Sequence, residues 1–291
     1  MRRPAKYWDQ KQISWYVETL IHAMNADHVI NSTEMDFFYR ALQLVEEPSE
    51  KKRLVKILEE ETSELKRTLG LKLVEYGWIF NQLVMLLISD YSFTEEESKL
   101  LEDFAKVVGL KDDYFTQAMQ WCDAGLTWKT KQLELVEGHQ EVSNEYPPDI
   151  SVPIFLMEQP QLLWYAKVLV TTIVVDGIVD KNEIDIFKRV IGFIKDKKEM
   201  AQLIVCLKKK IKPALYHPQD ISDGILHRIF VEVITHFTMN QEYGEQEVTF
   251  VKQLAGVCGF SHDFVKAGMD LWREGRDWAA LGERLILQLD E

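Results

Sequence analysis

Long apolar runs, paired cysteines and an excess of positive charge are all missing from this 291-residue sequence. The most apolar window, Leu162–Val175, is shorter than the roughly 18–20 residues that a membrane-spanning helix needs. Three cysteines without metal-ligand spacing indicate reduced thiols, so we expect a cytoplasmic protein with neither disulfides nor a zinc site. The net charge of −13 argues against a general binder of nucleic acid.

Motifs of catalysis are missing as well. The sequence contains no Gly-rich phosphate loop, no GxSxG and no HExxH. We therefore expect a protein that is not an enzyme and holds no organic cofactor. An enzyme assembled from scattered residues is the alternative.

An internal duplication is the most informative feature that is present. Shifting the chain by 149 residues aligns 15–40 with 164–189, and eight of the 26 positions are identical. Shifting it by 150 aligns 90–128 with 240–278, where nine of 39 positions match. Two separate stretches thus agree on nearly the same offset. The sequence predicts two copies of one domain.

Helical periodicity runs through both copies, for example at Ile13, Val17, Leu20, Ile21 and Met24. The pattern predicts an all-α protein with two tandem domains, residues 1–137 and 160–291. In the first domain we expect helices at 11–26, 33–46, 49–60, 62–88 with a break near Gly70 or Gly77, 95–108, 112–124 and 127–137. In the second we expect them at 160–175, 181–194, 196–211, 221–239, 245–258, 262–274 and 277–289.

The segment between the copies, residues 138–159, contains Pro147 and Pro148, which block a helix. It also carries apolar residues, among them Val152, Phe155 and Leu156. That content is too high for a free linker, so we expect the segment to pack along one of the domains.

A short acidic motif occurs twice in each copy, at 27–34, 90–97, 176–183 and 240–247. Each version places Asn31, Thr94, Asp180 or Gly244 three residues before a glutamate, which is the spacing of a helix-capping box. The second interpretation is a cation site, in which Asp176, Asp180 and Glu183 supply oxygen ligands to a divalent ion such as Ca²⁺.

The stretch VVDGIVDKNEIDIF resembles the Asp-Gly-x-[Ile/Val]-[Asp/Ser]-x-x-Glu signature of the TerB-like domain of tellurite resistance. That domain also occurs in membrane-anchored DnaJ co-chaperones. The resemblance covers about residues 11–125 and 160–275, and the first copy departs from it at His28 and Asn31. It implies two tandem TerB-like helical bundles, a non-catalytic role in stress response or membrane-linked complexes, and metal binding through the acidic loops.

Two groups of residues are candidates for binding a partner. One is a set of tryptophans at equivalent places late in each copy, and the other is the largest basic cluster, which suits an acidic partner, a phosphate or an anionic lipid surface. The tryptophans are Trp121, Trp128, Trp272 and Trp278, and the lysines are Lys208, Lys209, Lys210 and Lys212. The alternative to partner binding is a structural role, in which the tryptophans anchor a closing helix and the lysines stabilise a helix end.

These observations predict a cytoplasmic scaffold or adaptor that binds a protein partner, without nucleic acid or a transmembrane segment and with peripheral membrane contact as an option. The alternative function is a metal-ion sensor that acts through the acidic loop. The sequence leaves the partner, the pathway and the oligomeric state open.

Overall fold

The computed structural model describes residues 7–26, 30–60, 70–137, 151–177, 179, 181–238 and 244–290. These residues form twelve α-helices and two short 3₁₀ turns, and they contain no strand. The all-α prediction is confirmed for the described residues. None of their helices is both long and apolar enough to cross a bilayer.

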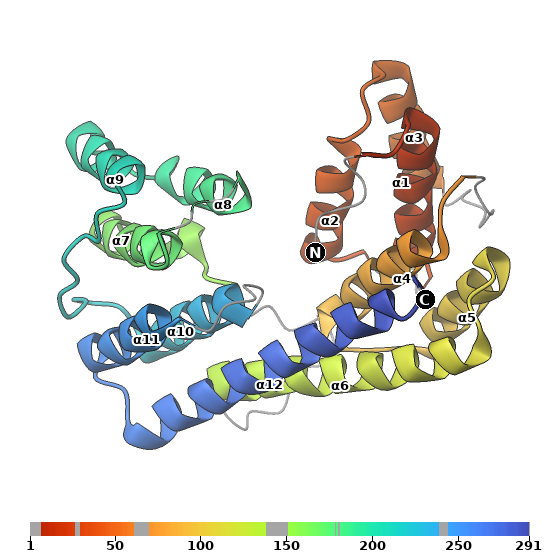
Figure 1. Ribbon diagram of the computed structural model, residues 1–291. Coiled ribbons are helices and arrows are strands. Elements are labelled where there is room, and N and C mark those ends of the chain that lie inside the picture. Colours follow the sequence, from red (N-terminus) through yellow and green to blue (C-terminus); the bar gives the residue numbers. More distant parts are fainter. Residues whose placement is uncertain are drawn as a thin grey trace. The chain divides into compact units, whose positions relative to one another are not determined.

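The chain divides into two compact units (Figure 1). The first contains the described residues up to Thr130 together with Asp277–Asp290, and the second contains Lys131–Glu137 and Ser151–Arg276. Each unit therefore combines segments that are far apart in the sequence. The predicted boundaries of the two sequence copies, 1–137 and 160–291, stay a prediction.

In the first unit, α1 packs against three other helices because Val17, Leu20 and Ile21 are fully buried along one of its faces. Its partners are α2, α3 and α4, and α4 packs in turn against α5. The helices are α1 (Gln10–Met24), α2 (Ser32–Leu42), α3 (Pro48–Glu60), α4 (Leu73–Leu87), α5 (Glu95–Val108) and the first part of α6 (Asp112–Glu137).

The second unit repeats this arrangement around α7, which packs against α8, α9 and α10, while α10 packs against α11. Its helices are α7 (Gln159–Val174), α8 (Lys181–Ile191), α9 (Lys197–Lys209), α10 (Asp223–Thr238), α11 (Glu245–Cys258) and the first part of α12 (His262–Leu287). Between the copies, the described part of the linker includes buried Val152, whereas Phe155 and Leu156 are exposed.

Two helix predictions are wrong. The expected pairs 112–124/127–137 and 262–274/277–289 are the single long helices α6 and α12. Gly125 lies inside α6 and does not interrupt it. A Cβ at this position would be only 2.7 Å from the Trp278 ring, which explains the glycine. The glycine allows close packing of two helices and does not end one. Of the helix expected at 62–88, residues 62–69 lie outside the described residues. Gly70, whose φ is +95°, precedes α4, and Gly77 lies inside α4.

Candidate functional site

The glutamates of three acidic motifs cap the helices that follow them. In each, a carboxylate oxygen accepts a hydrogen bond from the backbone N–H of the cap residue, at 2.9, 2.6 and 3.0 Å for Asn31–Glu34, Thr94–Glu97 and Gly244–Glu247. All three glutamates are buried. Satisfying an otherwise unpaired helix donor explains why a carboxylate is kept inside the fold at each of these positions.

The fourth motif contains the residues predicted to bind a metal. Glu183 is buried and its Oε1 lies 3.0 Å from Nε2 of His236, while Asp176 is exposed. Asp180 lies outside the described residues. Within those residues no group of three histidines, cysteines or acids is placed to hold a metal ion. The ion-sensor function therefore stays a prediction.

A chain of ionisable side chains links α7, α8 and α10 near this motif. The hydroxyl of Tyr165 donates to Oε2 of Glu232 at 2.6 Å, and His236 lies one helical turn after Glu232. Burial raises the pKa of Glu232, against the opposing effects of the Tyr165 hydrogen bond and of the His236 and Arg189 charges. Burial likewise raises the pKa of Tyr165. The first copy has Gln82 in place of Glu232, so this set of linked ionisable side chains is found in the second unit alone.

The predicted tryptophans all lie in the interior. Their exposed fractions are 2%, 3%, 1% and 7% for Trp121, Trp128, Trp272 and Trp278. In the first unit, the Trp121 and Trp278 rings stack at 4.8 Å, and each indole N–H donates to the other residue's backbone carbonyl at 2.8 Å. Anchoring of a closing helix accounts for this geometry, and the indole faces are not offered to a partner.

The predicted lysines lie at the C-terminal end of α9 and just beyond it, and all four are exposed. The Nζ of Lys210 donates to the carbonyl of Gly177 within the second unit. Lys208, Lys209 and Lys212 therefore form the more available part of this cluster.

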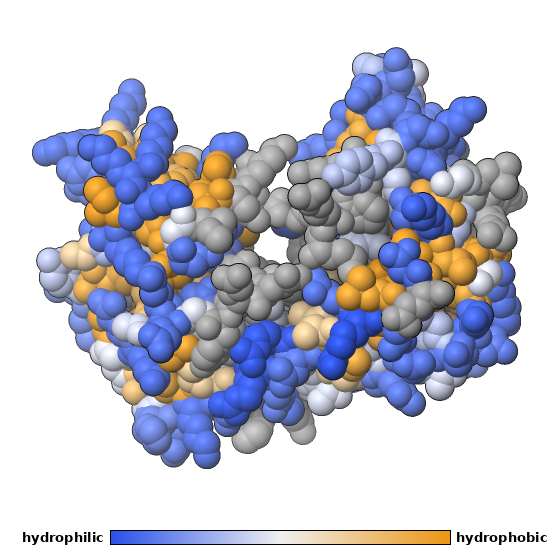
Figure 2. Space-filling model, in the orientation of Figure 1, coloured by the Kyte–Doolittle hydropathy of each residue, from blue (hydrophilic) through white to orange (hydrophobic). Residues whose placement is uncertain are grey.

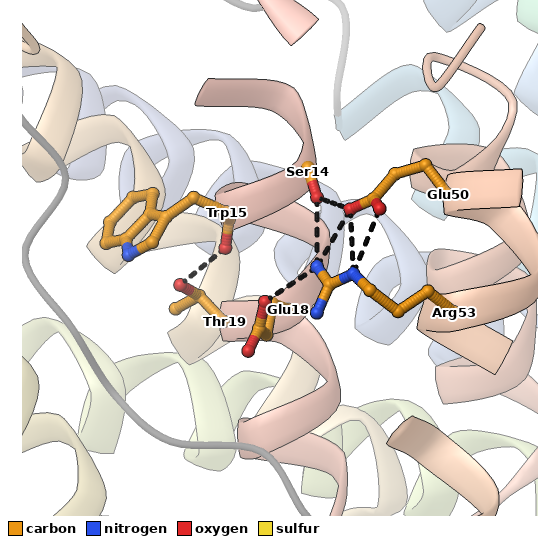
Figure 3. Close-up of polar contacts among 6 residues, drawn as sticks. All are labelled: Ser14, Trp15, Glu18, Thr19, Glu50 and Arg53. Atoms are coloured by element: carbon orange, nitrogen blue, oxygen red, sulfur yellow. Dashed lines mark hydrogen bonds and ion pairs between the residues drawn. The ribbon is translucent and has the colours of Figure 1, made fainter. Parts of the chain in front are cut away.

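A serine–carboxylate–arginine group joins α1 to α3 in the first unit (Figure 3). Ser14 donates to Glu50, and Arg53 holds the same carboxylate at 2.8–3.0 Å and Glu18 at 3.0 Å. The hydrogen bond from Arg53 lowers the pKa of Glu50. A carboxylate of lowered pKa is a poor general base for the serine, so the group acts as an ion-paired brace between two helices.

A repeated glutamine clamp positions the loop after the second helix of each copy. In the first unit, Gln10 donates to the carbonyl of Leu44 at 3.4 Å and accepts from the N–H of Glu46 at 2.8 Å. In the second, Gln159 makes the same pair of bonds, to Phe193 at 3.0 Å and from Lys195 at 2.7 Å. The two clamps are related by the 149-residue offset.

Exposed apolar side chains flank both clamps. In the first unit they are Tyr7 and Leu44, 74% and 39% exposed, which we call the first apolar corner. In the second they are Phe155, Leu156 and Phe193, 76%, 70% and 47% exposed, which form the second apolar corner. Apolar surface breaks through the hydrophilic cover over α7, α8 and α9 in Figure 2. Such side chains are typical of an interaction site when they cluster.

Sequence reasoning did not predict these corners. The repeat at offset 149 already pairs Leu156 with Tyr7 and Phe193 with Leu44, so each corner keeps apolar residues at the same two places. The sequence does not show that these apolar side chains are exposed to solvent. An apolar residue in a loop is usually assigned to the core.

Comparison with known proteins yields no match to any protein-family model, curated protein or solved structure. The likeness to TerB-like domains therefore rests on the motif alone and stays a prediction.

Proposed function

We propose that the protein is a non-catalytic scaffold or adaptor of the cytoplasm that binds another protein through its apolar corners. The observation that carries this proposal is the retention of exposed apolar residues beside the same glutamine clamp in both units. Folding alone gains nothing from an exposed phenylalanine or leucine, whereas a partner that covers it gains the burial of its apolar area.

The clamp supports the proposal because it fixes the corner before binding. Both bonds of Gln159 go to backbone groups of the loop that carries Phe193, so the loop has a defined path over the start of α7. A surface that is already ordered loses less conformational entropy on association.

Quantitative affinity capture from the source organism tests the proposal. The double variant Leu156→Ser/Phe193→Ser should reduce recovery of the bound partner to about half, because it removes one binding surface and leaves the first apolar corner intact. The control is Tyr39→Ser, which removes another exposed aromatic side chain from α2 in the first unit. Equal recovery with the wild type and the corner variant would remove the second apolar corner as the binding site.

A further inference from the structure

The outward face of α9 carries exposed lysines at both ends and no exposed acid. Leu203 is buried toward the rest of the unit, and α9 packs against α7. Lys197 is exposed, and Glu199 in the first turn is half-buried. The exposed residues that recur at helical spacing on one face are Lys198, Ala201, Gln202, Val205, Lys208 and Lys209. We call this set the α9 face.

Positive charge is concentrated in the segment that contains α9, in an otherwise acidic protein. Residues 188–212 carry nine basic and two acidic side chains, a net charge of +7, so the remaining residues carry −20 of the total of −13. Charges farther away than the Debye length of about 8–10 Å are largely screened at physiological salt. The face therefore presents a positive surface locally despite the acidic total.

Helix stability explains only half of this pattern. Lys208 and Lys209 stand in the last turn of α9, where cations favour the helix dipole. Lys197 and Lys198 stand in the first turn, where cations oppose it, beside the N-cap Asp196, whose side chain accepts from the N–H of Lys198 at 2.8 Å. Lysines at both ends point to a requirement other than the stability of the helix.

The first copy lacks the same charge at equivalent positions. Leu54 of α3 and Leu203 of α9 are both buried, so the two helices use the same inward position. On the outward side, Glu59 and Glu60 of α3 stand where α9 has Lys208 and Lys209. The packing of this helix therefore tolerates either sign in its last turn. Because α3 also exposes Lys52, Arg53 and Lys56, the feature specific to the second copy is a face without exposed acids.

We infer that the α9 face docks on an anionic lipid membrane. Its charges are all lysines, spread from Lys198 to Lys209 over about 16 Å of helix and not converging on one point. Spread point charges suit a planar anionic surface, whereas an acidic protein segment is better held by the fork of arginine. Val205 and Ile211, 46% and 50% exposed, lie among the lysines and add apolar contact at the headgroup level.

Vesicle co-sedimentation of the full chain tests this inference. The protein should bind vesicles that contain about one-third phosphatidylserine, should not bind pure phosphatidylcholine, and should be released by salt. Each lysine near the surface contributes about 5-fold in partitioning, so Lys208→Glu/Lys209→Glu should weaken binding at least about 30-fold. These glutamates are the residues that α3 carries at the same places.

The matched control is Lys52→Glu/Lys56→Glu, which makes the same change in net charge on α3. It should keep the binding of the wild type. The triple variant Lys198→Gln/Lys208→Gln/Lys209→Gln, whose fold is checked by circular dichroism, should also lose binding. Failure of the wild type to bind anionic vesicles at low salt, or equal losses in control and test variants, would overturn the inference. Capture of an acidic protein through this face without vesicle binding would overturn it too.

Discussion

At the scale of single residues, Glu232 distinguishes the second unit from the first. It accepts the hydroxyl of Tyr165 at 2.6 Å inside a cluster that also contains Glu183 and His236. The corresponding position in the first copy is Gln82, whose side chain is neutral. At this position the cost of removing a carboxylate from water is therefore present in the second copy only.

Replacing Glu232 with glutamine should stabilise the protein at neutral pH. Burial raises the folded-state pKa of Glu232 above its unfolded value, so its contribution to stability is full below the unfolded pKa and is lost as the pH rises through the folded pKa. Glu232→Gln keeps an acceptor for Tyr165 and removes the charge. Urea unfolding should show a gain on the order of 1 kcal/mol at pH 7 that disappears near pH 4.

The reciprocal change, Gln82→Glu, is the control and should lower the unfolding free energy at pH 7. A loss of stability in Glu232→Gln at pH 7 would show that the carboxylate contributes more through its contacts than it costs through burial.

At the scale of secondary-structure elements, α6 and α12 pack closely because glycine stands opposite tryptophan. Within the first unit, Gly125 lies against the Trp278 ring and Gly282 lies against the Trp121 ring. The amide of Asn81 on α4 donates to the carbonyl of Gly282 at 2.9 Å. The last turns of α12 are thus fixed by ring stacking and by hydrogen bonds to side chains from two helices.

Gly125→Ala should therefore destabilise the first unit. The added Cβ would lie 2.7 Å from two ring carbons of Trp278, which forces a shift in a packed interior. Thermal unfolding should show a loss of about 1–3 kcal/mol, the usual cost of overpacking.

Gly256→Ala in α11 is the matched control, because a Cβ there meets nothing within 4 Å. It should stabilise the protein by about 0.5–1 kcal/mol through the helix preference of alanine. Equal changes in unfolding free energy for the two alanine variants would contradict the close packing of Gly125 against the Trp278 ring.

The sequence predicted most helices within a few residues, because their apolar periodicity and cap residues are local signals. It failed at Gly125, where the reason for the glycine is a ring about 150 residues away in the sequence. It also could not separate buried from exposed apolar residues. Trp121 in α6 and Leu156 in the 3₁₀ turn before α7 are both apolar, but the first is buried and the second is exposed.

At the scale of the whole molecule, the C-terminal segment completes the first unit. Asp277–Asp290 belongs to the unit formed by α1–α5, and Leu285 and Ile286 are buried. The first copy in the sequence is therefore not sufficient to build the first unit. This interdependence is invisible in the repeat itself.

A chain that ends at Arg276 should lose stability selectively. Trp121 and Asn81 would lose the carbonyls to which they donate, and a set of buried apolar contacts would vanish. Hydrogen exchange should show reduced protection of α4 while α10 in the second unit keeps its protection. A chain that ends at Leu289 is the control, and uniform loss in both helices would contradict the division into units.

The number of partner molecules bound per chain is the decisive measurement for the proposed function. Once the partner is purified, native mass spectrometry of the wild type should detect up to two copies, since there are two apolar corners. Tyr7→Ser/Leu44→Ser or Leu156→Ser/Phe193→Ser should each leave one copy, and the combined variant should leave none. Full binding by the combined variant, folded as judged by circular dichroism, would contradict the assignment of the corners as the binding surface.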